Sequence, residues 1–106
     1  MSAPIAPEAL SRLRQLQQKP KFSPERYYPG APNEDIRSRC EKRVNDFLSG
    51  VISSLQRDSQ REDVFTQARA LNSTFAKEDT EEREKVEDYI GETMRIIGLE
   101  DWTEHV

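Results

Sequence analysis

Cysteine and histidine are nearly absent from this sequence of 106 residues, which contains one cysteine, Cys40, and one histidine, His105. One thiol cannot form an internal disulfide, so the chain is typical of a reducing compartment and we expect a cytoplasmic protein. One thiol and one imidazole cannot complete a zinc site, and di-iron bundles need the Glu-x-x-His motif twice. We therefore expect no metal and no cofactor.

Long hydrophobic runs are missing, and proline is confined to the start of the chain. The last proline is Pro32, so the rest of the sequence lacks the strongest helix breaker. No apolar run approaches the ~20 residues of a membrane span, and the N-terminus lacks the basic and apolar regions of a signal peptide. We expect no membrane partner.

Catalytic motifs are equally scarce. No glycine-rich phosphate-binding pattern occurs, and a Ser-His-Asp triad would depend on His105, one residue before the last. Cys40 lies on the apolar face of a predicted helix, where a buried packing thiol is far more frequent than a nucleophile. The sequence thus indicates no catalytic residue and favours a protein that is not an enzyme.

Charged residues are abundant, and the two halves of the chain carry opposite net charges. Charged residues make up 34% of the sequence, and the formal net charge is −4. Residues 1–50 have a net charge of +3, and residues 51–106 have a net charge of −7. These halves either attract each other within the fold or leave an acidic half for a basic partner. An acidic chain argues against nucleic-acid binding by the four cations of residues 37–43, and we expect no nucleic-acid partner.

Apolar residues recur with helical spacing along most of the chain. Four segments each place these residues on one face. The four faces consist of Leu10, Leu13 and Leu16; Ile36, Cys40, Val44, Phe47, Leu48, Val51, Ile52 and Leu55; Val64, Phe65, Ala68, Leu71 and Phe75; and Val86, Tyr89, Ile90, Met94 and Ile97. Gly50 lies inside the second helix and indicates a close helix crossing or a bend.

Start and stop signals separate these helices. Asn33 is placed to cap the second helix, Ser59 and Glu62 form a capping box for the third, and Gly98 predicts a Schellman ending for the fourth. Asp79 or Thr80 would cap the fourth helix. No segment alternates like a strand. We therefore predict an all-α fold, a small three- to four-helix bundle with one irregular Pro/Tyr-rich connection. Residues 1–106 would form a single domain, with loose tails at residues 1–6 and 103–106.

The irregular connection contains the sequence KFSPERYYPG, residues 21–30. Aromatic residues among cations suit either a platform for stacked bases or a strap that pins the connection onto the bundle. Three exposed aromatic rings would lose several kcal/mol of burial in a chain with so few apolar residues, so we favour the strap. Phe22 and one tyrosine should then pack on the bundle. The other tyrosine and Arg26 would remain outside as a contact.

The densest set of carboxylates lies within residues 77–92. Glu81, Glu84, Asp88 and Glu92 fall on one face of the fourth predicted helix. This ridge is either a solvated face that complements the helix dipole, a docking surface for a basic protein, or a weak site for Mg²⁺ or Ca²⁺.

The same segment carries a family resemblance. Its motif residues are Thr80, Glu81, Glu82, Arg83, Glu84, Tyr89, Met94, Ile97, Gly98, Leu99 and Glu100. This Thr-Glu-Glu-Arg-Glu run, leading into a helix that ends in Ile-Gly-Leu-Glu, resembles a family of small bacterial helical domains of unknown function. The resemblance implies an all-α fold and no particular activity.

Two functions remain open. The first is a non-catalytic interaction module, either an immunity- or antitoxin-like inhibitor with an acidic face or a self-associating protein. The second is a small enzyme or ligand-binding protein with a pocket between the Tyr-rich connection and the fourth helix. The candidate contact residues for either function are Arg26, Tyr27, Tyr28, Glu81, Arg83, Glu84, Asp88 and Glu92. A deep pocket joining a tyrosine, Arg83 and Glu84 would favour the second function, and a flat acidic face the first.

Overall fold

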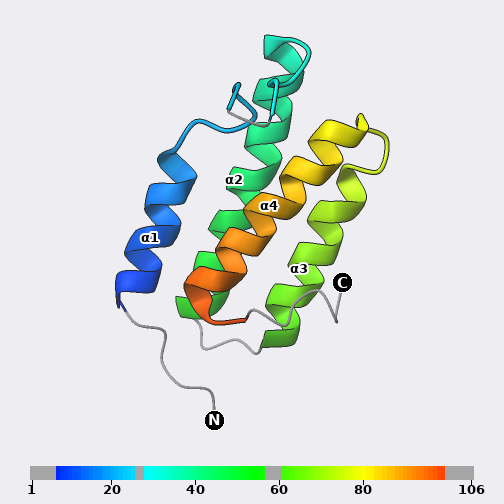
Figure 1. Ribbon diagram of the computed structural model, residues 1–106. Coiled ribbons are helices and arrows are strands. Elements are labelled where there is room, and N and C mark those ends of the chain that lie inside the picture. Colours follow the sequence, from blue (N-terminus) through cyan, green and yellow to red (C-terminus); the bar gives the residue numbers. More distant parts are fainter. Residues whose placement is uncertain (1–6, 26–27, 57–60, 100–106) are drawn as a thin grey trace.

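The computed structural model of the chain is a helical bundle, and it describes residues 7–25, 28–56 and 61–99 (Figure 1). The helices within these residues are α1 (Pro7–Gln18), α2 (Glu34–Gln56), α3 (Arg61–Thr74) and α4 (Thr80–Ile97). Extended backbone pairs there only in one isolated bridge, between Glu25 and Tyr28. The predicted all-α bundle with one irregular connection is therefore confirmed. The tails expected at 1–6 and 103–106 lie outside the described residues.

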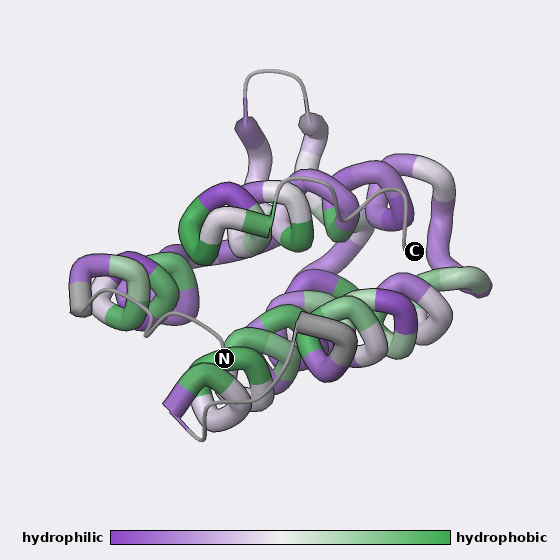
Figure 2. Tube along the Cα trace, turned by 90° about the horizontal axis from the view of Figure 1, so that it is seen from below, coloured by the Kyte–Doolittle hydropathy of each residue, from purple (hydrophilic) through white to green (hydrophobic). Residues whose placement is uncertain are grey.

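Helices α1 and α3 lie at opposite edges of the bundle, and α2 and α4 each contact both of them (Figure 1). Hydrophobic and hydrophilic stretches alternate along each helix in the end-on view of Figure 2. This alternation is expected when one face of each helix is buried. Among the described residues, no helix combines the length and hydrophobicity that crossing a lipid bilayer requires.

All four predicted apolar faces contribute to one core. The buried core residues are Leu13, Leu16, Phe22, Tyr28, Cys40, Val44, Phe47, Leu48, Val51, Ile52, Val64, Phe65, Ala68, Leu71, Phe75, Val86, Tyr89, Ile90 and Met94. The end positions of three faces, Leu10, Ile36, Leu55 and Ile97, are only partly buried. Cys40 is fully buried, as its place on the apolar face predicted, and burial raises the pKa of its thiol to about 11.

Two of the predicted helix ends are confirmed by hydrogen bonds. Asn33 Oδ1 accepts the N–H of Ile36 at 2.9 Å and so caps α2. Gly98 has φ 79°, and the N–H of Leu99 donates to Met94 O at 2.8 Å, which is the Schellman pattern. Asp79 occupies the N-cap position of α4, but its side chain makes no capping hydrogen bond. The capping box predicted for α3 needs Ser59, which lies outside the described residues.

Gly50 of α2 lies beside the side chain of Gln67, a residue of α3. A Cβ at this position would lie 2.4 Å from Oε1 of Gln67, so a side chain here would displace the Gln67 amide. That amide is held in place because its Nε2 donates to Ser54 Oγ at 2.8 Å. The absent side chain therefore leaves room for the Gln67 amide between α3 and α2.

Ion pairs join the basic half of the chain to the acidic half. Arg39 and Arg43 both bind Glu78, each at 3.0 Å. Burial raises the pKa of Glu78, but the hydrogen bonds from the two arginines outweigh it and hold the pKa below its ordinary value. The other two cations of residues 37–43 are also paired, Arg37 with Glu34 and Glu41, and Lys42 with Asp46. This part of the basic half is thus neutralised within the fold.

Candidate functional site

The connection between α1 and α2 is a strap, residues 21–31, that packs onto the bundle through two aromatic side chains. Phe22 is fully buried and Tyr28 is 7% exposed, which confirms that Phe22 and one tyrosine anchor it. The Phe22 ring stacks on Phe75, with ring centroids 5.7 Å apart, and meets Tyr28 and Tyr89 edge-on at 6.4 and 5.1 Å. Such pairs stabilise beyond the area they bury. Arg26 and Tyr27 lie outside the described residues.

The backbone of Phe22 adopts an unusual conformation that two hydrogen bonds hold. Its φ of 61° lies in the left-handed region, which disfavours a residue with a bulky side chain. The N–H of Phe22 donates to Tyr89 Oη at 3.0 Å, and its carbonyl accepts the N–H of Ala31 at 3.0 Å. The turn that follows includes Gly30, whose φ is 93°. The buried ring and these bonds together offset the backbone strain.

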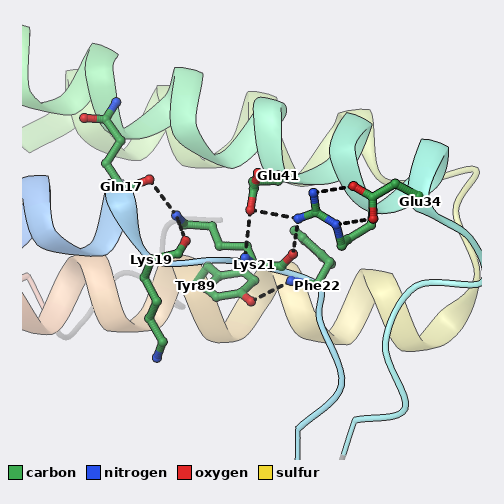
Figure 3. A network of polar contacts seen from close by, with 8 residues as sticks. Gln17, Lys19, Lys21, Phe22, Glu34, Glu41 and Tyr89 are labelled. Atoms are coloured by element: carbon green, nitrogen blue, oxygen red, sulfur yellow. Dashed lines mark hydrogen bonds and ion pairs between the residues drawn. The ribbon is translucent and has the colours of Figure 1, made fainter.

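Lys21, beside Phe22, is fully buried, and its side chain caps the C-terminal end of α1 (Figure 3). Its Nζ donates to the carbonyls of Gln17 and Lys19 at 3.1 and 2.8 Å, two groups at the C-terminal end of that helix. Its backbone N–H donates to Glu41 Oε2 at 2.9 Å, and its carbonyl accepts Arg37 Nη1 at 3.2 Å. Burial lowers the pKa of Lys21 to about 8, against the opposing attraction of Glu41.

Tyr28 joins the strap to α4 through a buried hydrogen bond. Its hydroxyl donates to Oε2 of Glu82 at 2.7 Å, and Glu82 is only 2% exposed. Burial, followed by this hydrogen bond, raises the pKa of Tyr28 well above its ordinary value. Glu82 was named above only as a residue of the family motif, and its burial was not predicted. Its spacing of four and seven residues before Val86 and Tyr89 was the available signal.

Lys85 makes a second connection between the strap and α4. Its Nζ is 2.9 Å from Glu25 Oε2 and lies 5.5 and 5.3 Å from the ring centroids of Tyr28 and Tyr89. These distances are those of cation–π contacts. The Lys85 side chain is 14% exposed, so it covers both rings while keeping contact with solvent.

A surface cleft of about 280 Å³ opens beside Lys85, between the strap and α4. Its lining residues are Tyr28, Pro29, Glu81, Glu84, Lys85 and Asp88, and we call it the acidic cleft. Glu81, Glu84 and Asp88 are exposed. None of these three carboxylates makes an ion pair or side-chain hydrogen bond with another described residue. The cleft is thus suited to positively charged groups.

The structure brings together four of the eight candidate contact residues, Tyr28, Glu81, Glu84 and Asp88. Glu92 instead lines a separate cleft between α4 and α1, together with Arg12 and Lys19. Arg83 does not line the acidic cleft, and its Nη2 donates to Thr80 Oγ1 at 3.0 Å. Lys85, which was not among the candidate contact residues, is the cation that lines the cleft.

The described residues contain no group of three His, Cys, Asp or Glu side chains arranged to hold a metal ion. The hydroxyl of Tyr28 is also committed to Glu82 inside the core, so the cleft meets the ring of this residue.

Comparison with known proteins gives a family without an assigned activity. No curated protein and no solved structure matches the chain. One family model, described as a domain of unknown function (DUF4844), matches residues 4–105. The expected membership in a family of unknown function is thereby confirmed. With this match over nearly its whole length, the chain belongs to the DUF4844 family.

Proposed function

We propose that this protein is a non-catalytic interaction module that binds a basic protein segment in the acidic cleft. The observation that carries the proposal is the unneutralised state of Glu81, Glu84 and Asp88, three exposed carboxylates on one face of α4. The two cations beside them on that helix bind other partners: Lys85, at the wall of the cleft, pairs with Glu25, and Arg83 donates to Thr80. The unneutralised carboxylates attract a basic partner, speed its association and make binding sensitive to salt.

The cleft has a firm frame and an apolar wall. The Tyr28 hydrogen bond to Glu82 and the Lys85 pair with Glu25 fix the strap against α4. Pro29 and Tyr28 of the strap line the cleft together with the carboxylates of α4. Lysine and arginine side chains combine an apolar stem with a charged end, so such a wall suits their stems while the carboxylates meet their charges.

The alternative, a small enzyme or ligand-binding protein, has one supporting observation. A cleft lies where that hypothesis placed it, and it contains Tyr28 and Glu84. However, it lacks Arg83, and the Tyr28 hydroxyl donates into the core. General acid–base catalysis needs the reacting atom within hydrogen-bond reach of the substrate. The geometry therefore favours a contact surface over a catalytic pocket.

An immunity- or antitoxin-like inhibitor is one form of this module, in which the acidic cleft covers a basic site on its target. Self-association is the other form, in which the basic segment belongs to a second copy. Sedimentation equilibrium distinguishes the two, because only a self-associating protein gives a mass that rises with its own concentration.

A binding titration tests the proposal with a short oligolysine peptide as the probe. Replacing the three carboxylates together, Glu81→Gln, Glu84→Gln and Asp88→Asn, should weaken binding about tenfold, since each exposed pair contributes a fraction of a kcal/mol. A matched control removes the same charge elsewhere on the surface: Glu8→Gln, Asp35→Asn and Asp63→Asn. Equal losses of peptide affinity in the two triple variants would show a general charge effect and refute the acidic cleft as the binding site.

A further inference from the structure

The acidic cleft adjoins a cation position that a residue of the chain itself already fills. The ammonium of Lys85 lies 5.5 Å from the ring centroid of Tyr28 and 5.3 Å from that of Tyr89. The carboxylate of Glu25 completes the surroundings at 2.9 Å. Two aromatic rings and a carboxylate around one ammonium group form the kind of site with which proteins recognise ammonium ligands.

Lys85, the residue that fills this cation position, lies at the protein surface. Lys85 also lines the acidic cleft, and its side chain is 14% exposed, whereas Tyr28 and Tyr89 are 7% and 4% exposed. Lys85 therefore covers rings that would otherwise face the cleft. Its long stem allows the ammonium to leave without a change in the backbone of α4.

We propose that Lys85 is an internal occupant of a cation-binding site, and that a lysine or arginine side chain of the protein partner replaces it on binding. This inference rests on the proposed function and names the side chain that the cleft recognises. The incoming cation would meet the rings of Tyr28 and Tyr89 and the carboxylate of Glu25.

The displaced ammonium has new partners nearby. Glu81 lies four residues before Lys85 on α4, and Asp88 lies three residues after it. Both spacings bring oppositely charged side chains into contact on a helix. The exchange therefore leaves no cation unpaired, because the partner takes the inner position and Lys85 moves to the cleft carboxylates.

Internal occupancy also predicts that Lys85 lowers the affinity for the partner. A ligand that must displace a resident group binds only the fraction of molecules whose site is empty. Its apparent affinity is the intrinsic affinity multiplied by that fraction. Partners whose cation does not reach the rings gain only the weaker contacts of the outer carboxylates. Lys85 would in this way select partners with a cation presented at the correct position.

Three variants that remove the same positive charge test the inference, with the oligolysine peptide as the probe. Lys85→Ala empties the site, Lys85→Met keeps an unbranched apolar side chain over the rings, and Arg83→Ala changes the charge of α4 outside the cleft. We expect Lys85→Ala to bind about fivefold more tightly than either control, which is the size of a partly exposed cation–π contact. Equal affinities for all three variants would overturn the inference.

The parent protein supplies a second readout that does not depend on how well the variants fold. The ring proton signals of Tyr28 and Tyr89 should shift in NMR spectra as the peptide is added. Unchanged tyrosine signals at saturation would also overturn the inference.

The two proposals fail in distinguishable ways. Peptide binding that depends on Glu81, Glu84 and Asp88, but is equal in Lys85→Ala and Arg83→Ala, would retain the interaction module and reject the exchange. No binding by the parent or by any variant would reject both.

Discussion

The hydroxyl of Tyr28 donates a hydrogen bond of 2.7 Å to Glu82, which lies 54 positions later in the chain. Both residues are buried, so this bond is a polar connection inside the core. It holds the strap against the first turn of α4, where the acidic cleft begins. The shape of the candidate site therefore depends on a buried hydrogen bond between the strap and α4.

Removing this hydrogen bond should destabilise the fold. Tyr28→Phe keeps the ring but leaves the buried carboxylate of Glu82 without its donor, and an unsatisfied buried group costs about 1–3 kcal/mol. Urea denaturation measures the loss. Glu82→Gln is the matched control, because its amide oxygen still accepts the Tyr28 hydroxyl and the loss should be smaller. A Tyr28→Phe protein as stable as the parent would show that the bond contributes nothing.

Phe22→Ala should destabilise the protein more strongly. The ring is fully buried among three other aromatic rings, and truncating such a side chain costs about 3 kcal/mol or more. Phe22→Leu, which keeps most of the apolar volume, should lose less. The competing interpretation of the strap as a base-stacking platform predicts an unchanged denaturation midpoint for Phe22→Ala and weaker, salt-sensitive binding of single-stranded nucleic acid by the variant.

Stability should rise with pH just above pH 8 because of Lys21. Its pKa is about 8 in the folded state and 10.5 ordinarily, so between these values the unfolded chain binds more protons than the folded protein. Unfolding free energy increases with pH wherever the unfolded state holds the additional proton. Denaturation curves from pH 7 to 9 measure the slope.

The rise should be confined to a narrow window. Above pH 9 Cys40 acts in the opposite direction, because burial raises its pKa to about 11 and the folded state then holds the additional proton. Tyr89, whose pKa burial raises to about 12, adds to this fall above pH 10. Lys21→Met is the control and should lack the rise between pH 8 and 9. Parallel profiles for the parent and this variant would contradict the assignment to Lys21.

Cys40 should react slowly with thiol reagents in the native protein. Its side chain is fully buried, and its raised pKa leaves little thiolate at neutral pH. Mixing with a chromogenic disulfide should modify the thiol rapidly in urea and only slowly without it. Rapid and complete reaction without denaturant would place Cys40 at the surface. It would contradict the assignment of this residue to the buried face of α2.

The helices could be predicted from the sequence because their information is local. The spacing of apolar residues and the signals at Asn33 and Gly98 are set within one or two turns, and the structure confirms both. The burial of Glu82 is not local in this sense. Glu82 lies on the same face as Val86 and Tyr89, but a carboxylate is usually exposed, and it is buried here with the hydroxyl of Tyr28 as its hydrogen-bond donor.

The sequence indicated which two segments carry the candidate contact residues, but not which side chains line the cleft. Its position between the strap and α4 follows from the aromatic and acidic segments. Lys85 rather than Arg83 lines the cleft. Two residues turn a helix by roughly 200°, so the two side chains point to nearly opposite sides, and the strap packs on the side of Lys85. The burial of Lys21 had no local signal, since it depends on Glu41 and Arg37 of α2.

The most direct test of the interaction module is a map of where a basic peptide binds the parent protein. Backbone amide signals followed by NMR during titration with oligolysine should shift most at Glu81, Glu84 and Asp88 and at strap residues beside Pro29, such as Tyr28 and Gly30. These shifts should diminish as salt is added, because exposed charges are screened. Shifts centred instead on the groove between α2 and α3, which Phe47 and Leu71 line, or no shifts at low salt, would contradict the proposed function.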